Sequence, residues 1–495
     1  MSAAAPDPLL EALRACVGAA YVLAPDAPAA ELEPFERDWR GRQRGRARAV
    51  VRPGSTAQVA AVVRACAAAG APIVPQGGNT GLVLGGVPDP SGTEVLLCTR
   101  RLNRIRTLDA ANHSLTLEAG CVLQTAQQAA AEAGLWLPLS LASEGSCTIG
   151  GNLATNAGGT QVLRFGNARD LCLGLEVVCP DGAIWHGLSG LRKDNTGYDL
   201  RHLYIGSEGT LGIITAATLK LQPQPAAQGC AWVGVPSLPA ALELLALAQR
   251  TLGPGLSGFE LMGQLALQLV AQHLPALRPP LWPDWPYCVL IELSESAAPD
   301  QGQSHPQSQL QTRLQSLLQS ALQQGCAGDA VLAESLAQAQ RLWHVRESIP
   351  LAQAQEGLNA KHDISLPISR IPAFCTEAEA LLAQTLPGAR LVNFGHLGDG
   401  NLHFNVQCPA GADAAAFLRL HEARINALVF DCVQRHCGSI SAEHGIGTLR
   451  AATLPRYKDV QALTLMRQIK QALDPQGLLN PGRVLARPLP DNPPP

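Results

Sequence analysis

A glycine-rich stretch decides how this chain is expected to fold: Pro75-Gln-Gly-Gly-Asn-Thr-Gly-Leu-Val-Leu-Gly-Gly86. It follows a short apolar segment, Pro72-Ile-Val-Pro75, that is typical of a buried strand. Glycines after a strand can present successive backbone N–H groups to an anionic diphosphate, because no Cβ blocks the approach. The stretch lacks the Lys-Ser/Thr of a Walker loop and the Gly-x-Gly-x-x-Gly of a Rossmann turn. It therefore indicates a diphosphate loop of another kind, although many glycine-rich turns bind nothing.

A second glycine-rich segment runs from Gly145 to Gly159, and its side chains are small or amide. Such residues suit a backbone that packs against a flat ring and donates hydrogen bonds to the polar edge of that ring. Around the two segments we expect a strand after Arg48, a helix over 56–70 capped by Ser55, strands over 94–105 and 114–118, a helix over 120–134 and a hairpin over 171–186. A helix over 9–21 and a proline-rich connector precede them, so we expect the ordered fold to begin near Arg48.

Two histidines flank a tight Gly-Asp-Gly turn in Phe394-Gly-His-Leu-Gly-Asp-Gly-Asn-Leu-His-Phe-Asn405. Imidazoles brought together by a glycine turn are suitable ligands for a divalent metal such as zinc. Further along, Glu443 and His444 lie beside the glycines of Gly445-Ile-Gly447 and offer a carboxylate as a third ligand. The alternative interpretation is a turn with one surface histidine and one packed histidine.

The composition is that of an ordinary globular protein: of 495 residues, 46% are hydrophobic and 16% charged, and the formal net charge is −3. This balance gives no reason to expect a nucleic-acid partner. The 14 cysteines show no regular spacing and favour a reducing compartment with free thiols. No signal peptide, transit peptide or membrane span is evident, so we expect a cytoplasmic protein.

Four motifs carry a resemblance to a known family: the 75–81 stretch, the segment 149–159, Lys193-Asp-Asn-Thr-Gly-Tyr-Asp199 and Gly206-Ser-Glu-Gly-Thr-Leu-Gly-Ile-Ile214. They resemble the FAD-binding domain of the vanillyl-alcohol oxidase, or PCMH, type. The resemblance is closest to the branch that holds D-lactate dehydrogenases, the glycolate oxidase flavin subunit and D-2-hydroxyglutarate dehydrogenases. It implies an α+β fold: a two-subdomain PCMH-type FAD-binding domain, an α+β cap domain for the substrate, and a C-terminal segment that returns to the flavin.

The resemblance also implies the cofactor and its binding residues. FAD is expected to be non-covalent, because Gly77, Gly78 and Asn79 stand where some relatives carry a histidine tether. The implied FAD-binding residues are Pro75, Gln76, Gly77, Gly78, Asn79, Thr80, Gly81, Leu82, Ser143, Gly145, Ser146, Thr148, Ile149, Gly150, Asn152, Thr155, Asn156, Gly158, Gly159, Glu208, Gly209, Gly212, Ile213, Ile214 and Asn480.

The second half of the chain supplies the implied substrate site. By the resemblance His396, His403 and Glu443 bind a divalent metal, expected to be Zn²⁺, and His444 is the catalytic base. Arg346, Lys361 and Asn405 are expected to bind the substrate, since arginine and lysine suit a carboxylate. The chain departs from D-2-hydroxyglutarate dehydrogenases at Pro350, where those enzymes carry a hydroxyl residue. The missing donor bears on recognition of a distal carboxylate.

The expected domains are an N-terminal helix and connector (1–44), the FAD-binding domain (45–223), the substrate domain with the metal site (224–455), a C-terminal FAD-contacting segment (456–487) and a disordered tail (488–495). In the second domain we expect helices over 236–252, 307–324 and 417–436, strands over 287–293 and 402–406, and an exposed loop over 299–309; a helix over 460–473 follows.

The expected function is oxidation of a D-2-hydroxy acid, such as lactate, glycolate or 2-hydroxyglutarate, to the 2-oxo acid by FAD. An electron-transfer flavoprotein, a quinone or a cytochrome is the expected electron acceptor, because no dinucleotide motif indicates NAD; a homodimer is allowed. Two alternatives stay open: the flavin subunit of a glycolate oxidase-like complex, and a metal-dependent hydrolase without a redox role.

Overall fold

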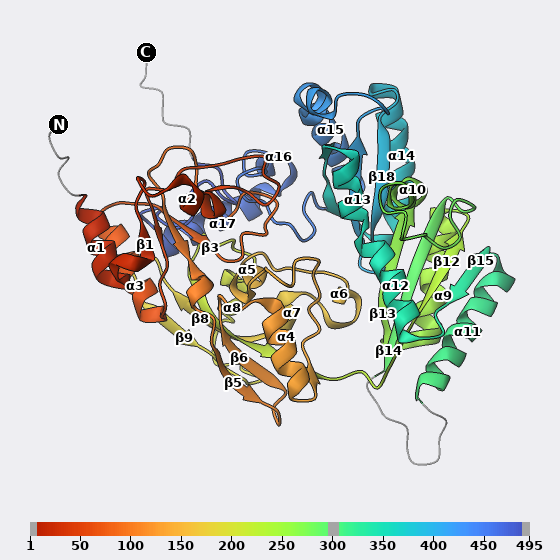
Figure 1. Ribbon diagram of the computed structural model, residues 1–495, viewed down its shortest axis with the longest axis horizontal. Helices are drawn as coiled ribbons and strands as arrows, with labels where there is room; N and C mark the ends of the chain where they lie inside the picture. The colour runs from red at the N-terminus through yellow and green to blue at the C-terminus, as the bar shows by residue number, and fades with distance from the viewer. Residues whose placement is uncertain (1–6, 296–305, 488–495) are drawn as a thin grey trace. The chain divides into compact units, whose positions relative to one another are not determined.

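The computed structural model describes residues 7–295 and 306–487 (Figure 1). The chain divides into two compact units. The first contains residues up to 158, residues 167–223 and residues from 443 onward; the second contains residues 159–166 and 224–442. Within the described ranges no helix is both long and apolar enough to cross a membrane.

The first unit begins with a four-stranded sheet in the order β1-β2-β4-β3. Its strands are β1 (Val22–Leu23), β2 (Ala49–Val51), β4 (Val95–Cys98) and β3 (Ile73–Gln76), of which the last three run parallel. Helix α3 (Thr56–Ala68) connects β2 to β3, and the Ser55 hydroxyl accepts the backbone N–H of Gln58 at its start, as predicted. The parallel strands are buried on both faces, which explains why β4 reads as a continuous apolar run, Val-Leu-Leu-Cys.

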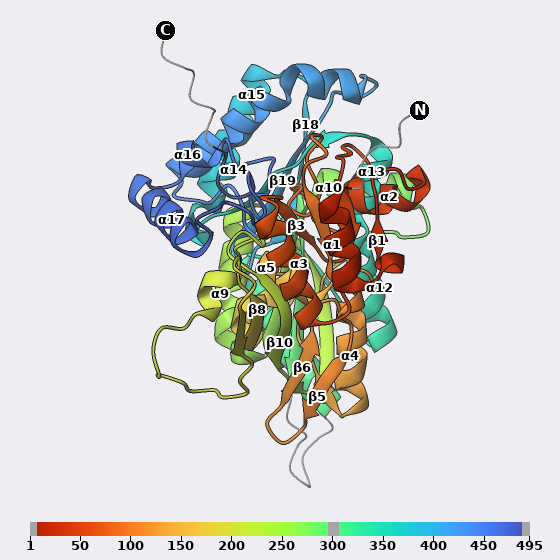
Figure 2. The same ribbon diagram turned by 90° about the vertical axis from the view of Figure 1, so that its left-hand side faces the viewer.

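The N-terminal segment belongs to this unit, so the expectation that the ordered fold begins near Arg48 is wrong. Helix α1 (Pro8–Val17) buries Leu9, Leu13 and Val17, which recur every four residues on one face, against α3 (Figure 2). Strand β1 then pairs antiparallel with β2. A 3₁₀ turn at Ala19–Tyr21 follows α1, and helix α2 (Ala29–Glu36) occupies the expected connector.

A five-stranded antiparallel sheet forms the other half of the first unit, in the order β5-β6-β10-β8-β9. Its strands are β5 (Ile105–Asp109), β6 (Ser114–Glu118), β10 (Ile213–Lys220), β8 (Cys172–Val178) and β9 (Ile184–Gly187), the last two forming the predicted hairpin. The strand expected over 94–105 is divided, because a 3₁₀ turn at Thr99–Arg101 separates β4 from β5. Helix α4 (Leu123–Glu132) lies within the helix expected over 120–134.

Short elements and the C-terminal segment complete the first unit. Leu479 forms a parallel bridge with Ile73 of β3, so the end of the chain extends the first sheet. The remaining elements are β7 (Leu135–Trp136), α5 (Ile149–Ala154), α7 (Ala168–Leu171), α8 (Arg201–Tyr204), β11 (Gln222–Pro223), α16 (Leu454–Tyr457) and α17 (Val460–Leu473).

The second unit is built on one antiparallel sheet in the order β15-β12-β14-β13-β18-β19-β16, with β17 paired to β19. Its strands are β12 (Ala227–Val235), β13 (Leu256–Gly263), β14 (Tyr287–Glu295), β15 (Asp329–Leu332), β16 (Asn359–Ala360), β17 (Asp363–Ser365), β18 (Arg390–His396) and β19 (Asn401–Gln407). Strands β18 and β19 form the hairpin that carries the two histidines of the Gly-Asp-Gly turn.

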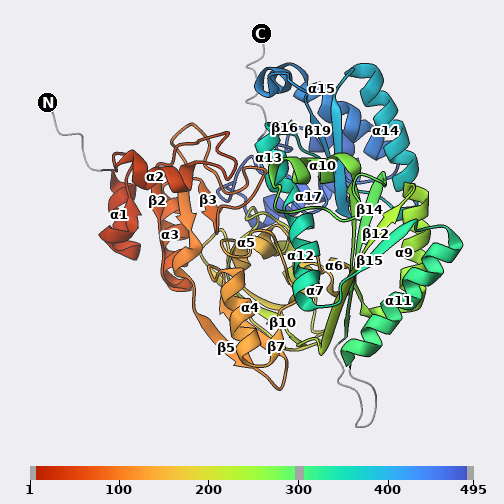
Figure 3. The same ribbon diagram turned by 45° about the vertical axis from the view of Figure 1, so that its right-hand side comes forward.

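Helices cover both faces of this sheet (Figure 3). Alternate residues of β12 point to opposite faces of the sheet and contact different helices. Cys230 and Trp232 pack with α10, α12 and α13, whereas Gly229 lies against Leu310 of α11. The helices are α6 (Val162–Phe165), α9 (Leu238–Leu252), α10 (Gln264–His273), α11 (Pro306–Gln324), α12 (Leu336–Glu347), α13 (Ile349–Glu356), α14 (Ile371–Thr385) and α15 (Ala414–Arg435).

Three expectations about this region and the chain end need comment. The exposed loop expected over 299–309 lies partly outside the described residues, and its last part, 306–309, begins α11 instead. The tail expected after Arg487 lies outside the described residues. The second unit ends at Ala442, before the expected position 455, because the segment that begins with Glu443 packs with the first unit.

The packing of α1 gives a stability prediction. Leu13→Ala should lower the unfolding free energy by about 2–5 kcal/mol, because the truncation leaves a cavity between α1 and α3. Leu10→Ala, on the partly exposed side of the same helix, is the matched control and should cost less. Urea or thermal unfolding monitored by circular dichroism measures both; equal and negligible effects would show that α1 does not belong to the core.

Candidate functional site

Glycines of the first loop are required because the two glycine-rich loops touch. A Cβ on Gly77 would lie 2.2 Å from the Thr148 hydroxyl oxygen, and a Cβ on Gly78 would lie 2.2 Å from the Ser146 carbonyl oxygen. Either clash would force the loops apart, since no side chain fits in such a gap. The spacing of glycines in the sequence thus reflects contact between the loops as well as access to their backbone.

The N-terminal segment holds the first loop from outside. The Asn79 amide donates to the carbonyl oxygens of Pro34 (3.1 Å) and Arg37 (2.9 Å), and Asn79 itself has a left-handed φ of 58°. The Gln76 amide donates to the Phe35 carbonyl oxygen at 2.8 Å. Asparagine tolerates this backbone conformation better than most residues, so one residue both turns the loop and anchors it to the end of α2.

Both loops line a single cavity of the first unit, and His444 lines it too. The expected FAD-binding residues found in the lining are Pro75, Gln76, Gly77, Gly78, Asn79, Thr80, Gly81, Thr148, Gly150, Asn152, Thr155, Glu208, Gly209, Gly212, Ile213 and Ile214. The hydroxyl of Thr148 is buried there without a hydrogen-bond partner among the described residues. An unpaired buried hydroxyl and a lining of glycine backbone fit a cofactor that has both a diphosphate and a polar ring edge.

Several expected FAD-binding residues lie outside this lining: Leu82, Ser143, Gly145, Ser146, Ile149, Asn156, Gly158, Gly159 and Asn480. Some of them support it from behind. The Ser146 carbonyl lies under Gly78, and the Asn156 side chain accepts the Arg169 backbone N–H at 3.0 Å. Gly159 belongs to the second unit, whereas Gly158 belongs to the first.

Glu208 ties the glycine-rich region to the segment that carries His444. Its carboxylate accepts the backbone N–H groups of Ile446 and Gly447, each at 2.7 Å, and the side chain is almost completely buried. Burial raises the pKa of Glu208, while the two N–H donors act in the opposite direction. Gly447 has a φ of 52°, and a Cβ there would lie 2.0 Å from the Val83 carbonyl oxygen. The segment after His444 is therefore held by the first glycine-rich loop and by Glu208 of the 206–214 motif.

The C-terminal segment closes the same region through Asn480. Its amide donates to the carbonyl oxygens of Gly85 (2.9 Å) and Glu208 (2.7 Å), and its backbone N–H donates to the Ile73 carbonyl oxygen. The Asn480 side-chain oxygen is buried without a hydrogen-bond partner among the described residues. The expected position of Asn480 at the flavin ring stays a prediction; what the structure gives it is a link between the first loop and Glu208.

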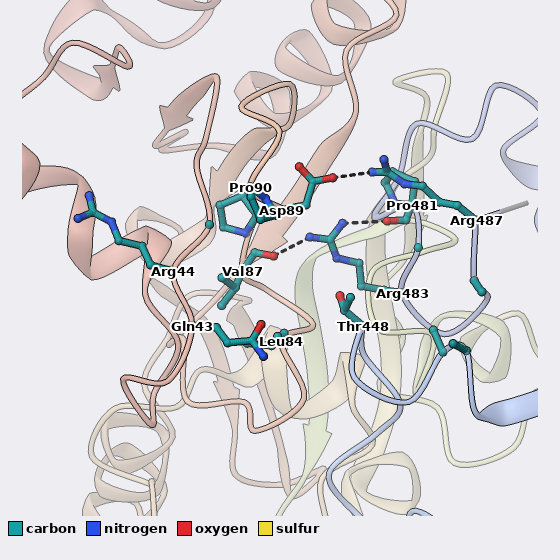
Figure 4. A pocket seen from close by; sticks show the side chains of 16 residues that line it. Gln43, Arg44, Leu84, Val87, Asp89, Pro90, Thr448, Pro481, Arg483 and Arg487 are labelled. Atoms are coloured by element: carbon teal, nitrogen blue, oxygen red, sulfur yellow. Dashed lines mark hydrogen bonds and ion pairs between the residues drawn. The ribbon is translucent and has the colours of Figure 1, made fainter. Parts of the chain in front are cut away.

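A second cavity, of 360 Å³, lies between the loop after Gly86 and the C-terminal segment (Figure 4). Its arginines are paired. Arg483 donates to the Val87 carbonyl oxygen at 2.6 Å and forms an ion pair with buried Glu94, and Arg487 pairs with Asp89 and Glu94. These contacts fasten the C-terminal segment to the loop after Gly86, so Arg483 and Arg487 have a structural role.

In the second unit His396 belongs to a buried charge network. Its Nδ1 lies 2.7 Å from Glu260 on the neighbouring strand β13, and Arg346 of α12 donates to the other oxygen of that carboxylate at 2.9 Å. Burial favours the neutral acid, but His396 and Arg346 outweigh burial and lower the pKa of Glu260. The lowered pKa favours the ionised carboxylate, which in turn favours the Nδ1–H tautomer of His396.

His403 lies beside His396, with ring centroids 5.7 Å apart at an angle of 75°. Behind it, Asp363 of β17 stands directly opposite on the paired strands, 3.9 Å from the His403 Nδ1, and accepts a hydrogen bond from Asn401. The hairpin thus brings the two predicted histidine ligands together, with the Glu260 carboxylate at hydrogen-bond distance from His396 and the Asp363 carboxylate 3.9 Å from His403. The other predicted groups, Glu443 and His444, begin the segment of the first unit, 3.8 Å from each other.

The substrate contact expected of Asn405 stays a prediction, and both polar groups of Asn405 already have partners in the structure. The Asn405 oxygen accepts the His362 backbone N–H at 3.1 Å, and its amide donates to Gln353 at 2.9 Å, all three residues being buried. Although His403 and Asn405 do share a face of β19, as predicted, both polar groups of Asn405 are used inside the unit. Lys361, between β16 and β17, and Arg346 stay predicted substrate ligands.

Sequence reasoning missed the carboxylates Glu260 and Asp363. Each had a weak signal: Glu260 is a single acid in an apolar strand, Gly258-Phe-Glu-Leu-Met262, and Asp363 follows Lys361-His362 directly. A lone acid in an apolar strand indicates a buried and paired carboxylate. Only strand pairing shows that Glu260 lies beside His396 and Asp363 beside His403, because these residues are far apart in the sequence.

Comparisons with known protein families identify the class of protein to which this chain belongs. Residues 47–187 match an FAD binding domain, and residues 224–484 match the C-terminal domain of FAD linked oxidases. Together with the fold and the glycine-lined cavity, these matches identify an FAD-dependent oxidoreductase. The chain belongs to the family of FAD linked oxidases.

Relatives of this chain include D-2-hydroxyglutarate dehydrogenases. The chain is 39% identical to the mitochondrial D-2-hydroxyglutarate dehydrogenase of Bos taurus over 456 residues, which covers 92% of this chain and 80% of that protein. It is also 39% identical to the D-2-hydroxyglutarate dehydrogenase of Xanthomonas citri pv. viticola, covering 92% of this chain and 93% of that protein.

Solved structures confirm the predicted fold class. The chain resembles p-cresol methylhydroxylase with substrate bound, with a TM-score of 0.74 and 17% identity, over 97% of this chain and 96% of that one. A 4-ethylphenol oxidase from Gulosibacter chungangensis gives a TM-score of 0.72 at 19% identity, over 97% of both chains. At these identities the likeness concerns the fold alone.

The anchoring of the first loop gives a prediction about FAD binding. Asn79→Ala should weaken FAD retention, because it removes both bonds to the α2 region and strains a left-handed backbone. Asn79→Gly is the matched control, since it loses the same bonds but relieves the strain. FAD content after gel filtration measures both. Full retention in both variants would contradict the anchoring role, and a loss in Ala alone would assign the effect to the backbone.

Proposed function

We propose that this enzyme oxidises the C2 hydroxyl of a D-2-hydroxy acid to the 2-oxo acid and passes the hydride to FAD. One observation carries the proposal: His444 lines the same cavity as the two glycine-rich loops. A base that lines a flavin pocket suits a reaction in which a hydroxyl loses its proton as C2 loses a hydride. The names of the D-2-hydroxyglutarate dehydrogenase relatives support this substrate class.

His444 would accept the hydroxyl proton. Its position depends on Glu208, whose carboxylate fixes the backbone two and three residues further on. FAD, when bound, supplies the hydride acceptor, and the first and second loops would hold its diphosphate and its ring. The protein's own contribution is to orient the substrate and to keep the base within reach of the hydroxyl.

His396, His403 and Glu443 would hold a divalent metal, with Zn²⁺ the proposed ion. Two observations support this proposal: the two histidines are adjacent on one hairpin, and the Glu260 carboxylate orients His396. The Asp363 carboxylate lies 3.9 Å from the Nδ1 of His403. A metal there would lower the pKa of the substrate hydroxyl as a Lewis acid. Glu443 directly follows Ala442, whose backbone N–H donates to the Asp363 carbonyl oxygen at 3.3 Å.

Arg346 and Lys361 would bind the substrate carboxylate. Glu260 pairs with the Nε and Nη2 side of the Arg346 guanidinium, and the substrate carboxylate would be bound by the remaining N–H groups. Pro350 lies in the first turn of α13, where a proline is well accommodated but offers no side-chain donor. We therefore propose a substrate whose distal end is bound differently from that of 2-hydroxyglutarate.

The electron acceptor and the compartment are also proposals. We propose an electron-transfer flavoprotein, a quinone or a cytochrome as acceptor, in a reducing compartment such as the cytoplasm. None of the 14 cysteines, all of which lie in the described residues, forms a disulfide, which supports a reducing compartment. The alternative of a metal-dependent hydrolase is set aside, because the FAD-binding match spans residues 47–187.

Anaerobic flavin bleaching tests the proposed function. Purified protein should be yellow, and its flavin absorbance should fade with D-2-hydroxy acids but not with their L enantiomers. His444→Ala should keep its bound FAD, because the glycine-rich loops are unchanged, yet lose bleaching by the same acids. Bleaching by neither enantiomer would overturn the substrate class, and normal bleaching in the variant would overturn the role of His444.

The Glu260 network gives a prediction about metal binding. Glu260→Gln should lower Zn²⁺ affinity by roughly 10- to 100-fold, because the carboxylate that orients His396 loses its charge. Glu292→Gln on the neighbouring strand β14 is the matched control: Glu292 also accepts several hydrogen bonds, from Gln161, Ser257 and Trp343, but serves no histidine. Metal content after dialysis against a graded chelator measures both; equal losses in the two variants would point to general destabilisation.

A further inference from the structure

A second group of metal-ligand side chains lies in the second unit, on the antiparallel pair of helices α14 and α15. It consists of Glu377 on α14 and of Cys432 and His436 at the end of α15. Their ligand atoms all lie within 4.8 Å of one another, and Glu377 Oε2 is 2.8 Å from His436 Nε2. None of the three belongs to the residues proposed above for catalysis.

The spacing on α15 explains the arrangement. Cys432 and His436 are four residues apart, so both side chains project from the same face of the helix, toward α14. A thiol, an imidazole and a carboxylate are the three protein ligand types of zinc, and three of them leave a fourth position for water. The side chains of His436 and Glu377 are 12% and 38% exposed, so solvent ions can reach the group.

The surroundings hold each ligand in place. Arg435 binds Oε1 of Glu377 at 2.8 Å, which leaves Oε2 directed at His436. The ring of buried Phe374 stands edge-on to the His436 ring, with centroids 6.0 Å apart. Oriented ligands lose little freedom when an ion binds, and a charged partner behind the carboxylate is typical of metal sites.

Two other groups close to the cluster have different roles. Cys375 on α14 is buried and accepts a hydrogen bond from the Asn393 amide. Cys437 follows His436 but is exposed and has a φ of 60°, at the point where α15 has ended. Cys432, in contrast, is fully buried beside the carbonyl oxygen of Phe374.

We infer that Glu377, Cys432 and His436 form a binding site for a divalent transition metal of the zinc type. The bound ion would cross-link α14 and α15 at one end. Phe374 also packs against Phe404 of β19, next to His403, with ring centroids 5.1 Å apart. The cross-link would therefore stiffen the layer of side chains next to His403, one of the proposed ligands of the catalytic metal, without touching that histidine. The competing outcome is an ion pair of Glu377 with Arg435 and His436 that binds no metal.

Cobalt titration of the FAD-loaded, chelator-treated protein tests the inference. A thiolate ligand gives Co²⁺ a charge-transfer absorption in the near ultraviolet, whereas His396, His403 and Glu443 contain no sulfur. Difference spectra against the metal-free protein should show this band rising until the Glu377, Cys432 and His436 site has taken up one Co²⁺ per protein. Zn²⁺ should abolish the band by competition. Absence of the band would overturn the inference while leaving the proposed catalytic metal untouched.

Variants identify the ligands. Cys432→Ser should lose the band, and Cys437→Ser, the adjacent exposed cysteine, should keep it. Glu377→Gln retains the thiol and should weaken Co²⁺ binding by at least the roughly 10- to 100-fold that loss of an outer partner costs. A band that survives Cys432→Ser, or that disappears in Cys437→Ser, would overturn the assignment. Glu377→Gln keeps the test decisive even if Cys432→Ser does not fold.

Discussion

A single buried carboxylate, Glu208, holds together the segments that line the cavity of the two glycine-rich loops and His444. It accepts two backbone N–H groups of the 446–447 turn, and its own carbonyl accepts the amide of Asn480. Three segments far apart in the sequence therefore meet at one residue. Without the carboxylate two buried N–H groups would lose their acceptor, and leaving such groups unpaired costs more than an average hydrogen bond contributes. The position of His444 follows from this constraint.

The second unit also contains a buried carboxylate, Glu260, that binds groups from separate segments of the chain. A buried charge is costly by itself, so the carboxylate is tolerated only because His396 and Arg346 share it. The arrangement couples a predicted metal ligand to a predicted substrate ligand through one acid. Replacing the acid would disturb both, which means that the two proposed functions of the unit, holding an ion and binding a carboxylate, are not independent.

Supporting contacts around the glycine-rich loops come from the two ends of the chain. Gln76 and Asn79 fasten the first loop to the segment around α2, and Arg483 fastens the C-terminal segment to Val87 and Glu94. Loops rich in glycine are flexible by themselves, because glycine has more backbone freedom in the unfolded chain than other residues. These contacts restrict that freedom, so the described N-terminal residues around α2 support the first glycine-rich loop and are more than a connector.

The fold class followed from the family resemblance that four motifs carry. The sequence by itself also determined what depends on local chemistry: the glycine-rich loops, the Ser55 cap, the β8–β9 hairpin and the pair His396 and His403. These features arise from residues close together in the chain, and their spacing is visible there. Tertiary structure alone decided the partners: Glu260 behind His396, Glu208 beneath the His444 segment, α1 on α3, and the engagement of Asn405 with His362 and Gln353. Such pairings join residues that are remote in the chain, and burial, which makes them energetically decisive, is a property of the packed unit and not of any local pattern.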